Sequence, residues 1–243
     1  MYSARAGWWH ASSSLAWFQI QVQDRSQPSS DDDAVVEMTG SDFRIVTVDK
    51  GLMKAEPWLN HQPFGQMPYL LDDENGLEVF ESRALIRYAA AKINSNLLPT
   101  PEKGIKEFAA FETACAFEMA DFDGPATGIW FEHVGKKMRG LEFSQAALDG
   151  HKAVLAKKLE GYERVLSKSK YLAGPEMTLA DLFYLPYGTQ AVVLGGAPGM
   201  TDGTFPNVAR WWKEISTLEN WTKRNEIPDG SVMRGLNASA LTW

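Results

Sequence analysis

Cysteine is nearly absent from this sequence, since Cys115 is the single cysteine among 243 residues. One cysteine excludes both an internal disulfide and a cysteine-built metal cluster. Its neighbours Phe111, Ala114 and Phe117 indicate a buried helix, so we expect an inert core thiol. The four histidines show no close spacing such as H-x-x-x-H, which argues against a histidine-built metal site. They are His10, His61, His133 and His151.

Long apolar runs are also missing. No run approaches the roughly 18 residues that a membrane-spanning helix needs, so we expect no membrane association. Segment 1–23 contains no acidic residue and has Arg5 as its one firm positive charge. It lacks a continuous apolar stretch, which argues against a secretory signal and leaves an organelle transit peptide as a weak alternative. The sequence therefore predicts a cytoplasmic protein.

Basic residues are outnumbered, because 24 Lys and Arg against 31 Asp and Glu leave a formal net charge of −7. This balance argues against a nucleic-acid partner, for which a basic surface is expected. It does not exclude a local basic pocket for an anionic small molecule. The hydrophobic fraction of 44% and the charged fraction of 23% are typical of globular proteins. The length predicts one large domain or two small ones.

The sequence pattern changes at a polar segment, residues 94–103, which contains Pro99 and Pro101 and predicts a linker. Other expected parts are an irregular N-terminal extension at 1–14, a mixed α/β domain at 15–93, an all-helical domain at 104–225 and a tail at 226–243.

Before the linker, the pattern is mixed. Two apolar runs, 69–71 and 77–80, flank a segment that ends in Asn75-Gly76, a dipeptide typical of a β-hairpin turn. The acids at 31–33 favour a helix N-terminus. The other expected elements are strands at 16–22 and 43–48, a short helix at 34–38 and a longer helix at 82–92.

After the linker, apolar residues recur at helical spacing. Asp123-Gly124-Pro125 is expected to bend or interrupt the first helix. Thr178 and Asp181 form a capping box before an apolar helix, which predicts a structural role for both. Further helices are expected at 147–166 and 206–218. The apolar positions that define these helices are Phe108, Phe111, Ala114, Cys115 and Met119; Val154, Leu155, Leu159, Tyr162 and Leu166; Leu182, Leu185 and Val192; and Val208, Trp211, Trp212 and Ile215.

One short region carries candidate chemistry. Met67-Pro68 precedes a predicted strand, where a cis X-Pro bond would expose the Met67 backbone to an extended peptide. Ser82 begins a predicted helix, whose N-terminus attracts a carboxylate. Glu81 beside it can hold an ammonium group. A site that reads an amino-acid head and an extended backbone suits a small peptide.

Several motifs together resemble the glutathione S-transferase family, most closely its phi-like fungal and plant members. The resemblance covers roughly Asp42 to Thr222. The motifs are Gln62-Pro-Phe-Gly-Gln-Met-Pro-Tyr69, Phe80-Glu-Ser-Arg83, Leu172-Ala-Gly174, Thr178-Leu-Ala-Asp-Leu182 and Pro206-Asn-Val-Ala-Arg-Trp-Trp212.

The resemblance implies a thioredoxin-like N-terminal domain and an all-α C-terminal domain, with Pro68 as a structural cis-proline. It implies that Gln66 and the Met67 backbone hold the cysteinyl part of glutathione. Glu81 and Ser82 would hold the γ-glutamyl end, and Lys54 the glycine carboxylate. The preceding family position is often histidine but here is Met53.

The implied activity is detoxifying conjugation of the glutathione thiolate to a hydrophobic electrophile, in a homodimer. Glutathione is then a co-substrate, and no metal or redox cofactor is implied. Some aromatic residues of the helical domain should line the apolar substrate site, although most such residues are core. The candidates are Phe117, Phe122, Trp130, Tyr184 and Tyr187.

The catalytic serine of phi-like enzymes falls on Ser26 by gap-free counting from residues 40–43. The local sequence, Asp24-Arg25-Ser26-Gln27-Pro28, departs from the family's P-x-S-T pattern. A serine hydroxyl is needed because a free thiol, with a pKa of about 8.5, is mostly protonated at neutral pH. The departure keeps one alternative open, a non-catalytic binding or assembly module of the elongation factor gamma type. A glutathione-dependent peroxidase or isomerase on the same scaffold is a further alternative, because a fold does not determine the chemistry that it supports.

Overall fold

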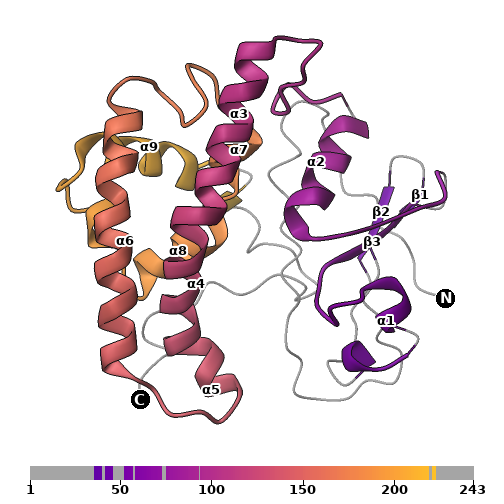
Figure 1. The fold of residues 1–243 in the computed structure, drawn as a ribbon, viewed down its shortest axis with the longest axis horizontal. Helices are drawn as coiled ribbons and strands as arrows, with labels where there is room; N and C mark the ends of the chain where they lie inside the picture. Colours follow the sequence, from indigo (N-terminus) through magenta and orange to yellow (C-terminus); the bar gives the residue numbers. More distant parts are fainter. Residues whose placement is uncertain are drawn as a thin grey trace. The chain divides into compact units, whose positions relative to one another are not determined.

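The computed structural model describes residues 36–39, 42–45, 52–56, 58–72, 75–92, 94–218 and 221–222. Within them the chain forms two compact units, divided between Ser95 and Asn96. This division falls inside the segment 94–103. The first unit contains a β-sheet, whereas all named elements of the second unit are helices (Figure 1).

The first unit is built on a four-stranded sheet with the strand order β2-β1-β3-β4. Strand β1 is antiparallel to β2 and parallel to β3, and β3 is antiparallel to β4. The elements of this unit are β1 (Val36–Thr39), β2 (Asp42–Ile45), the 3₁₀ turn η2 (Leu52–Lys54), α1 (Trp58–His61), β3 (Tyr69–Asp72), β4 (Leu77–Phe80) and α2 (Ser82–Lys92).

The expected hairpin and the helix after it are confirmed. Tyr69 pairs with Phe80 and Asp72 pairs with Leu77, so β3 and β4 are in antiparallel register along their whole length. Gly76 has φ 59°, the left-handed conformation that glycine adopts without steric cost. Helix α2 begins at Ser82 as predicted.

The helix predicted at 34–38 is wrong, because residues 36–39 form strand β1. The sequence Val36–Thr39 alternates apolar and polar residues, which is the period of a strand. Strand β1 pairs with a strand on each side, so its backbone N–H and C=O groups have hydrogen-bond partners. A helix of five residues would not be stable on its own. Of the strand predicted at 43–48, residues 43–45 lie in β2. The predicted strand at 16–22 lies outside the described residues.

Helix α2 packs on the β3–β4 hairpin through a small apolar core. Leu70 of β3 and Leu85 of α2 are almost completely buried against each other, with Val79 and Tyr88 beside them. Ile86 is also buried. The packing fixes the orientation of α2, whose first residue belongs to the candidate site.

The second unit begins with one long helical stretch that contains two π-helical segments, η3 and η4. Gly124 and Pro125 open α4 directly after the first of them. The chain therefore stays helical through Asp123-Gly124-Pro125, and the interruption predicted there is a change from a π-helical to an α-helical hydrogen-bond pattern. The elements are α3 (Ile105–Phe117), η3 (Glu118–Asp123), α4 (Gly124–Trp130), η4 (Phe131–Gly135), α5 (Lys136–Met138), α6 (Gln145–Leu166), α7 (Leu179–Leu182), α8 (Leu185–Val193), η5 (Pro198–Met200) and α9 (Pro206–Ser216).

Aromatic rings form the centre of the helical unit. Tyr184 is fully buried and contacts Phe122 at 4.6 Å and Trp211 at 5.1 Å between ring centroids.

The structure differs from the predicted helices in two respects. Two of the apolar residues that defined these helices are exposed, Met119 to 59% and Val154 to 48%. The predicted helix after Thr178 is divided into α7 and α8 by a turn at Phe183 and Tyr184. Cys115 is buried, as expected.

The capping box before α7 is present. Asp181 also accepts hydrogen bonds from residues outside the cap. Its Oδ2 accepts from the Thr178 backbone N–H at 2.9 Å and from the Thr178 hydroxyl at 3.3 Å. Its Oδ1 accepts from the Leu172 backbone N–H at 3.0 Å and from the Trp211 indole N–H at 2.9 Å. Asp181 therefore joins α7, the segment before it and α9.

Candidate functional site

The Met67–Pro68 peptide bond is cis and immediately precedes β3, as the sequence predicted. Because Tyr69 pairs with Phe80, the residues just outside this pair, Pro68 and Glu81, leave the same end of the hairpin. The antiparallel register therefore brings the Met67–Pro68 segment next to the Glu81–Ser82 segment, although they are separated by more than a dozen positions in sequence.

Gln62, which sequence reasoning did not select as a site residue, fixes the shape of the loop before Met67. Its side chain is buried, and Oε1 accepts from the backbone N–H groups of Phe64 at 2.9 Å and Gln66 at 3.0 Å. Lys54 Nζ donates to the Phe64 carbonyl at 3.1 Å. The ring of Phe64 lies edge-on to that of Phe80, with 6.1 Å between centroids. These contacts bring Lys54 and Gln66 to the hairpin end.

Gly65 allows this loop to close. Its φ is 57°, and a Cβ added there would lie 2.5 Å from the Met53 carbonyl oxygen and 2.9 Å from Lys54 Nζ. A side chain therefore meets both a conformational cost and rigid backbone.

We expect Gly65→Ala to weaken binding at this site by about tenfold or more, because it displaces the Gln66–Met67 backbone. Gly76→Ala is the matched control. Its φ of 59° imposes the same conformational cost, but nothing lies within 4 Å of the added Cβ. Calorimetric titration with the ligand proposed below, alongside urea denaturation, measures both effects. Equal losses of affinity in the two variants would contradict a specific role for the Gly65 loop.

Glu81 has φ 71°, a left-handed backbone conformation that is uncommon for a residue other than glycine. Its carbonyl accepts from the Leu85 N–H at 2.9 Å, so Glu81 caps α2 while its side chain is exposed. Ser82 is the first residue of α2 and is partly buried. Strained backbone of this kind concentrates at binding sites.

An apolar cluster packs against Met67, the first residue of the cis peptide bond. Trp58 and Tyr69 are buried edge to face at 5.8 Å, with Met53 and Met67 packed against them. His61 Nδ1 lies 3.1 Å from Glu78 Oε2 and 3.4 Å from the Tyr69 hydroxyl, which joins α1 to the hairpin. The hydrogen bond from His61 lowers the pKa of Glu78.

The structure thus places Lys54, Gln66, Met67, Glu81 and Ser82 in one unit, with the last four at one hairpin end or in the loop that leads to it. Ser26 lies outside the described residues.

The aromatic candidates of the helical unit differ in burial. Phe122 and Tyr184 are core residues, whereas Phe117, Trp130 and Tyr187 are partly exposed. Trp130 and Tyr187 contact each other at 6.1 Å.

Among the described residues, no helix is both long and apolar enough to cross a membrane. In the same part of the chain, no group of three or more His, Cys, Asp or Glu side chains is arranged to hold a metal ion.

Comparisons with known proteins agree with this architecture. The family model "Glutathione S-transferase, N-terminal domain" matches residues 33–91, and "Glutathione S-transferase, C-terminal domain" matches residues 110–219. Glutathione S-transferase PM239X14 of Arabidopsis thaliana is 44% identical over 71% of this chain and 79% of its own length. Glutathione S-transferase hmp2 of Hypomyces subiculosus is 36% identical over 74% of this chain and 84% of its own.

A solved structure is similar as well. Glutathione S-transferase-I bound with lactoylglutathione matches with a TM-score of 0.68 and 32% identity, over 76% of this chain and 86% of the other. The two-unit fold is therefore that of a glutathione-dependent transferase. The chain belongs to the glutathione S-transferase family, and the resemblance to phi-like members and the predicted fold class are confirmed. It is a transferase enzyme.

Proposed function

We propose that this enzyme binds glutathione at the end of the β3–β4 hairpin and transfers its thiolate to a hydrophobic electrophile. The observation that carries this proposal is the register of the hairpin. It brings the cis Met67–Pro68 bond and the start of α2 at Glu81–Ser82 to the same end of the hairpin.

Each part of glutathione has a partner of matching chemistry there. Glu81 holds the ammonium group of the γ-glutamyl end, and the start of α2 at Ser82 holds its carboxylate. The Met67 backbone pairs with the extended cysteinyl part as an added strand does, supported by Gln66. Lys54, with three donor protons, holds the glycine carboxylate while it still donates to the Phe64 carbonyl.

The second substrate is proposed to lie against aromatic side chains of the helical unit, with Trp130 and Tyr187 as candidates. We further propose that the enzyme acts in detoxification in the cytoplasm and needs no metal or redox cofactor. Lactoylglutathione in the similar transferase structure supports glutathione as the co-substrate.

Two measurements test the proposed function together: conjugation of glutathione to a generic aryl halide, and retention of the protein on immobilised glutathione. We expect both turnover and retention. Retention without turnover would select a binding module in place of an enzyme. Absence of both would remove glutathione as the ligand.

We also propose a homodimer. Phe64 is 62% exposed although it is aromatic, which suits a surface covered by a second copy of the chain. Light scattering should give twice the monomer mass of 27.1 kDa. A Phe64→Ser variant should shift this equilibrium toward the monomer.

Ser26 is proposed to activate the thiol by donating a hydrogen bond to the sulfur. Such a bond is worth roughly 1.5–3 kcal/mol, so Ser26→Ala should raise the pKa of the bound thiol by about one to two units. Glutathione affinity should change little, because Ser26 does not hold the peptide ends. Ultraviolet titration of the thiolate in the complex measures this shift. Identical titration curves for parent and variant would exclude Ser26 as the activating group.

A further inference from the structure

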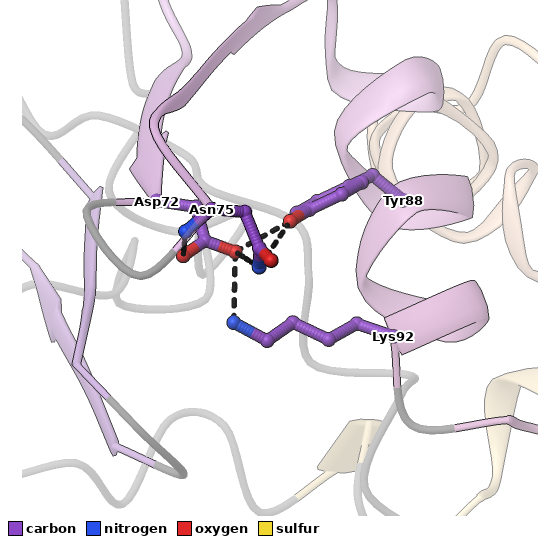
Figure 2. A network of polar contacts seen from close by, with 4 residues as sticks. All are labelled: Asp72, Asn75, Tyr88 and Lys92. Carbon is purple, nitrogen blue, oxygen red and sulfur yellow. Dashed lines mark hydrogen bonds and ion pairs between the residues drawn. The ribbon is translucent and has the colours of Figure 1, made fainter.

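Asp72, the last residue of β3, is the centre of a buried polar network (Figure 2). Lys92 Nζ donates to its Oδ2 at 2.8 Å, and the Tyr88 hydroxyl donates to the same oxygen. Asn75 donates its backbone N–H to Oδ1 at 3.3 Å and its amide N–H to Oδ2 at 2.9 Å. Tyr88 and Lys92 extend from the C-terminal half of α2, so one carboxylate joins this helix to the hairpin turn.

The ion pair between Lys92 and Asp72 attaches the helix strongly because the carboxylate is buried. The Asp72 side chain is completely buried, whereas that of Lys92 is 19% exposed. The hydrogen bond from Lys92, followed by that from Tyr88, holds the pKa of Asp72 well below its usual range. The carboxylate is therefore ionised at neutral pH. Removing one partner of a buried, hydrogen-bonded ion is far more disruptive than removing an exposed one.

The opposite end of α2 carries the candidate glutathione contacts. Helix α2 has eleven residues and a length of about 16 Å, with Glu81 as its joint to β4. The joint is in the left-handed conformation, and such strain persists only where the surrounding structure fixes it. Together with the apolar core, the Asp72 network attaches the helix to the hairpin and resists a pivot about Glu81.

We propose that Asp72, Tyr88 and Lys92 are positioning residues for glutathione. They hold α2 so that Glu81 keeps the left-handed backbone that presents its carboxylate and Ser82 to the γ-glutamyl end. They act through the helix and do not touch the ligand. The inference rests on the proposed glutathione site and names residues that lie at the far end of α2 from it.

Lys92→Met and Tyr88→Phe each remove a hydrogen bond to Asp72 while they keep most of the side chain. We expect glutathione affinity, measured by calorimetry where each variant is fully folded, to fall about three- to tenfold. Hydrogen exchange at the Leu85 N–H, which bonds to the Glu81 carbonyl, should accelerate. Thr178→Ala is the control: it removes a cap hydroxyl in the helical unit and should lower stability without changing affinity. A lower denaturation midpoint with unchanged affinity in the network variants would overturn the inference.

Glu81→Asp supplies a second test, because aspartate enters the left-handed region more readily and keeps the carboxylate. The loss of affinity caused by Lys92→Met should be smaller in this background, and a double-mutant cycle measures the difference. Equal losses in both backgrounds would contradict the coupling. If Glu81→Gln binds glutathione as the parent does, the proposed site itself fails. If Glu81→Gln weakens binding but Lys92→Met does not, only the positioning role fails.

Discussion

Glu81→Gly should abolish most glutathione binding and leave the fold about as stable as the parent. Glycine adopts φ 71° without steric cost, which offsets the greater freedom that it gives the unfolded chain. The variant loses the carboxylate that we assign to the γ-glutamyl ammonium. A charge-assisted contact is worth roughly 1.5–3 kcal/mol, so affinity should fall at least about tenfold. Calorimetry and thermal denaturation measure the two halves of this prediction.

A second carboxylate on the same hairpin provides the control for Glu81. Glu78 is also exposed, and its partner is His61, so Glu78→Gln should leave glutathione affinity unchanged. Ser82→Ala should again weaken binding by about tenfold, because it removes a contact to the ligand carboxylate. Parent-like affinity in both Glu81→Gly and Ser82→Ala would exclude this helix start from the site.

The largest expected loss of stability follows Asp181→Ala. Burial raises the pKa of Asp181, and the hydrogen bonds from Leu172, Thr178 and Trp211 oppose that shift. Truncation leaves three N–H donors without their acceptor in the core of the helical unit. At about 1–3 kcal/mol for each buried unsatisfied group, the free energy of unfolding should fall by about 3 kcal/mol or more.

Thr178→Ala separates the local cap from the wider network. It removes the hydroxyl but keeps the backbone N–H that donates to Asp181 at 2.9 Å, so it should cost only about 1 kcal/mol. Urea denaturation followed by circular dichroism compares the two variants. Equal losses would show that Asp181 acts as a cap alone. A large loss of turnover in Thr178→Ala with an unchanged midpoint would contradict its structural assignment.

Local patterns predicted the hairpin and α2 correctly, because each depends on residues within a few positions of one another. Asn75-Gly76 selects the turn, and the turn then determines which residues of β3 and β4 pair. The adjacency of Met67 and Glu81 follows directly from that register. The arrangement of these two segments at one end of the hairpin was therefore predictable from short-range chemistry together with the family motifs.

Long-range partners were not predictable in this way. The cap at Thr178 and Asp181 is visible in four residues, but the Trp211 indole that completes it lies 30 positions away. Strand β1 depends on neighbours on both sides, so its apolar residues and preceding acids were mistaken for a helix. Gln62 begins a family motif that assigned it no role, and Asp72 belongs to none of the motifs. Only the fold shows that one closes the loop and the other attaches α2.

The location of the glutathione site is tested most directly by titrating isotope-labelled protein with glutathione and following its backbone amide signals by nuclear magnetic resonance. The account predicts that the largest shifts fall on Gln66, Met67, Ser82 and Leu85. Saturable shifts confined to other residues, with these four amides unmoved, would contradict it.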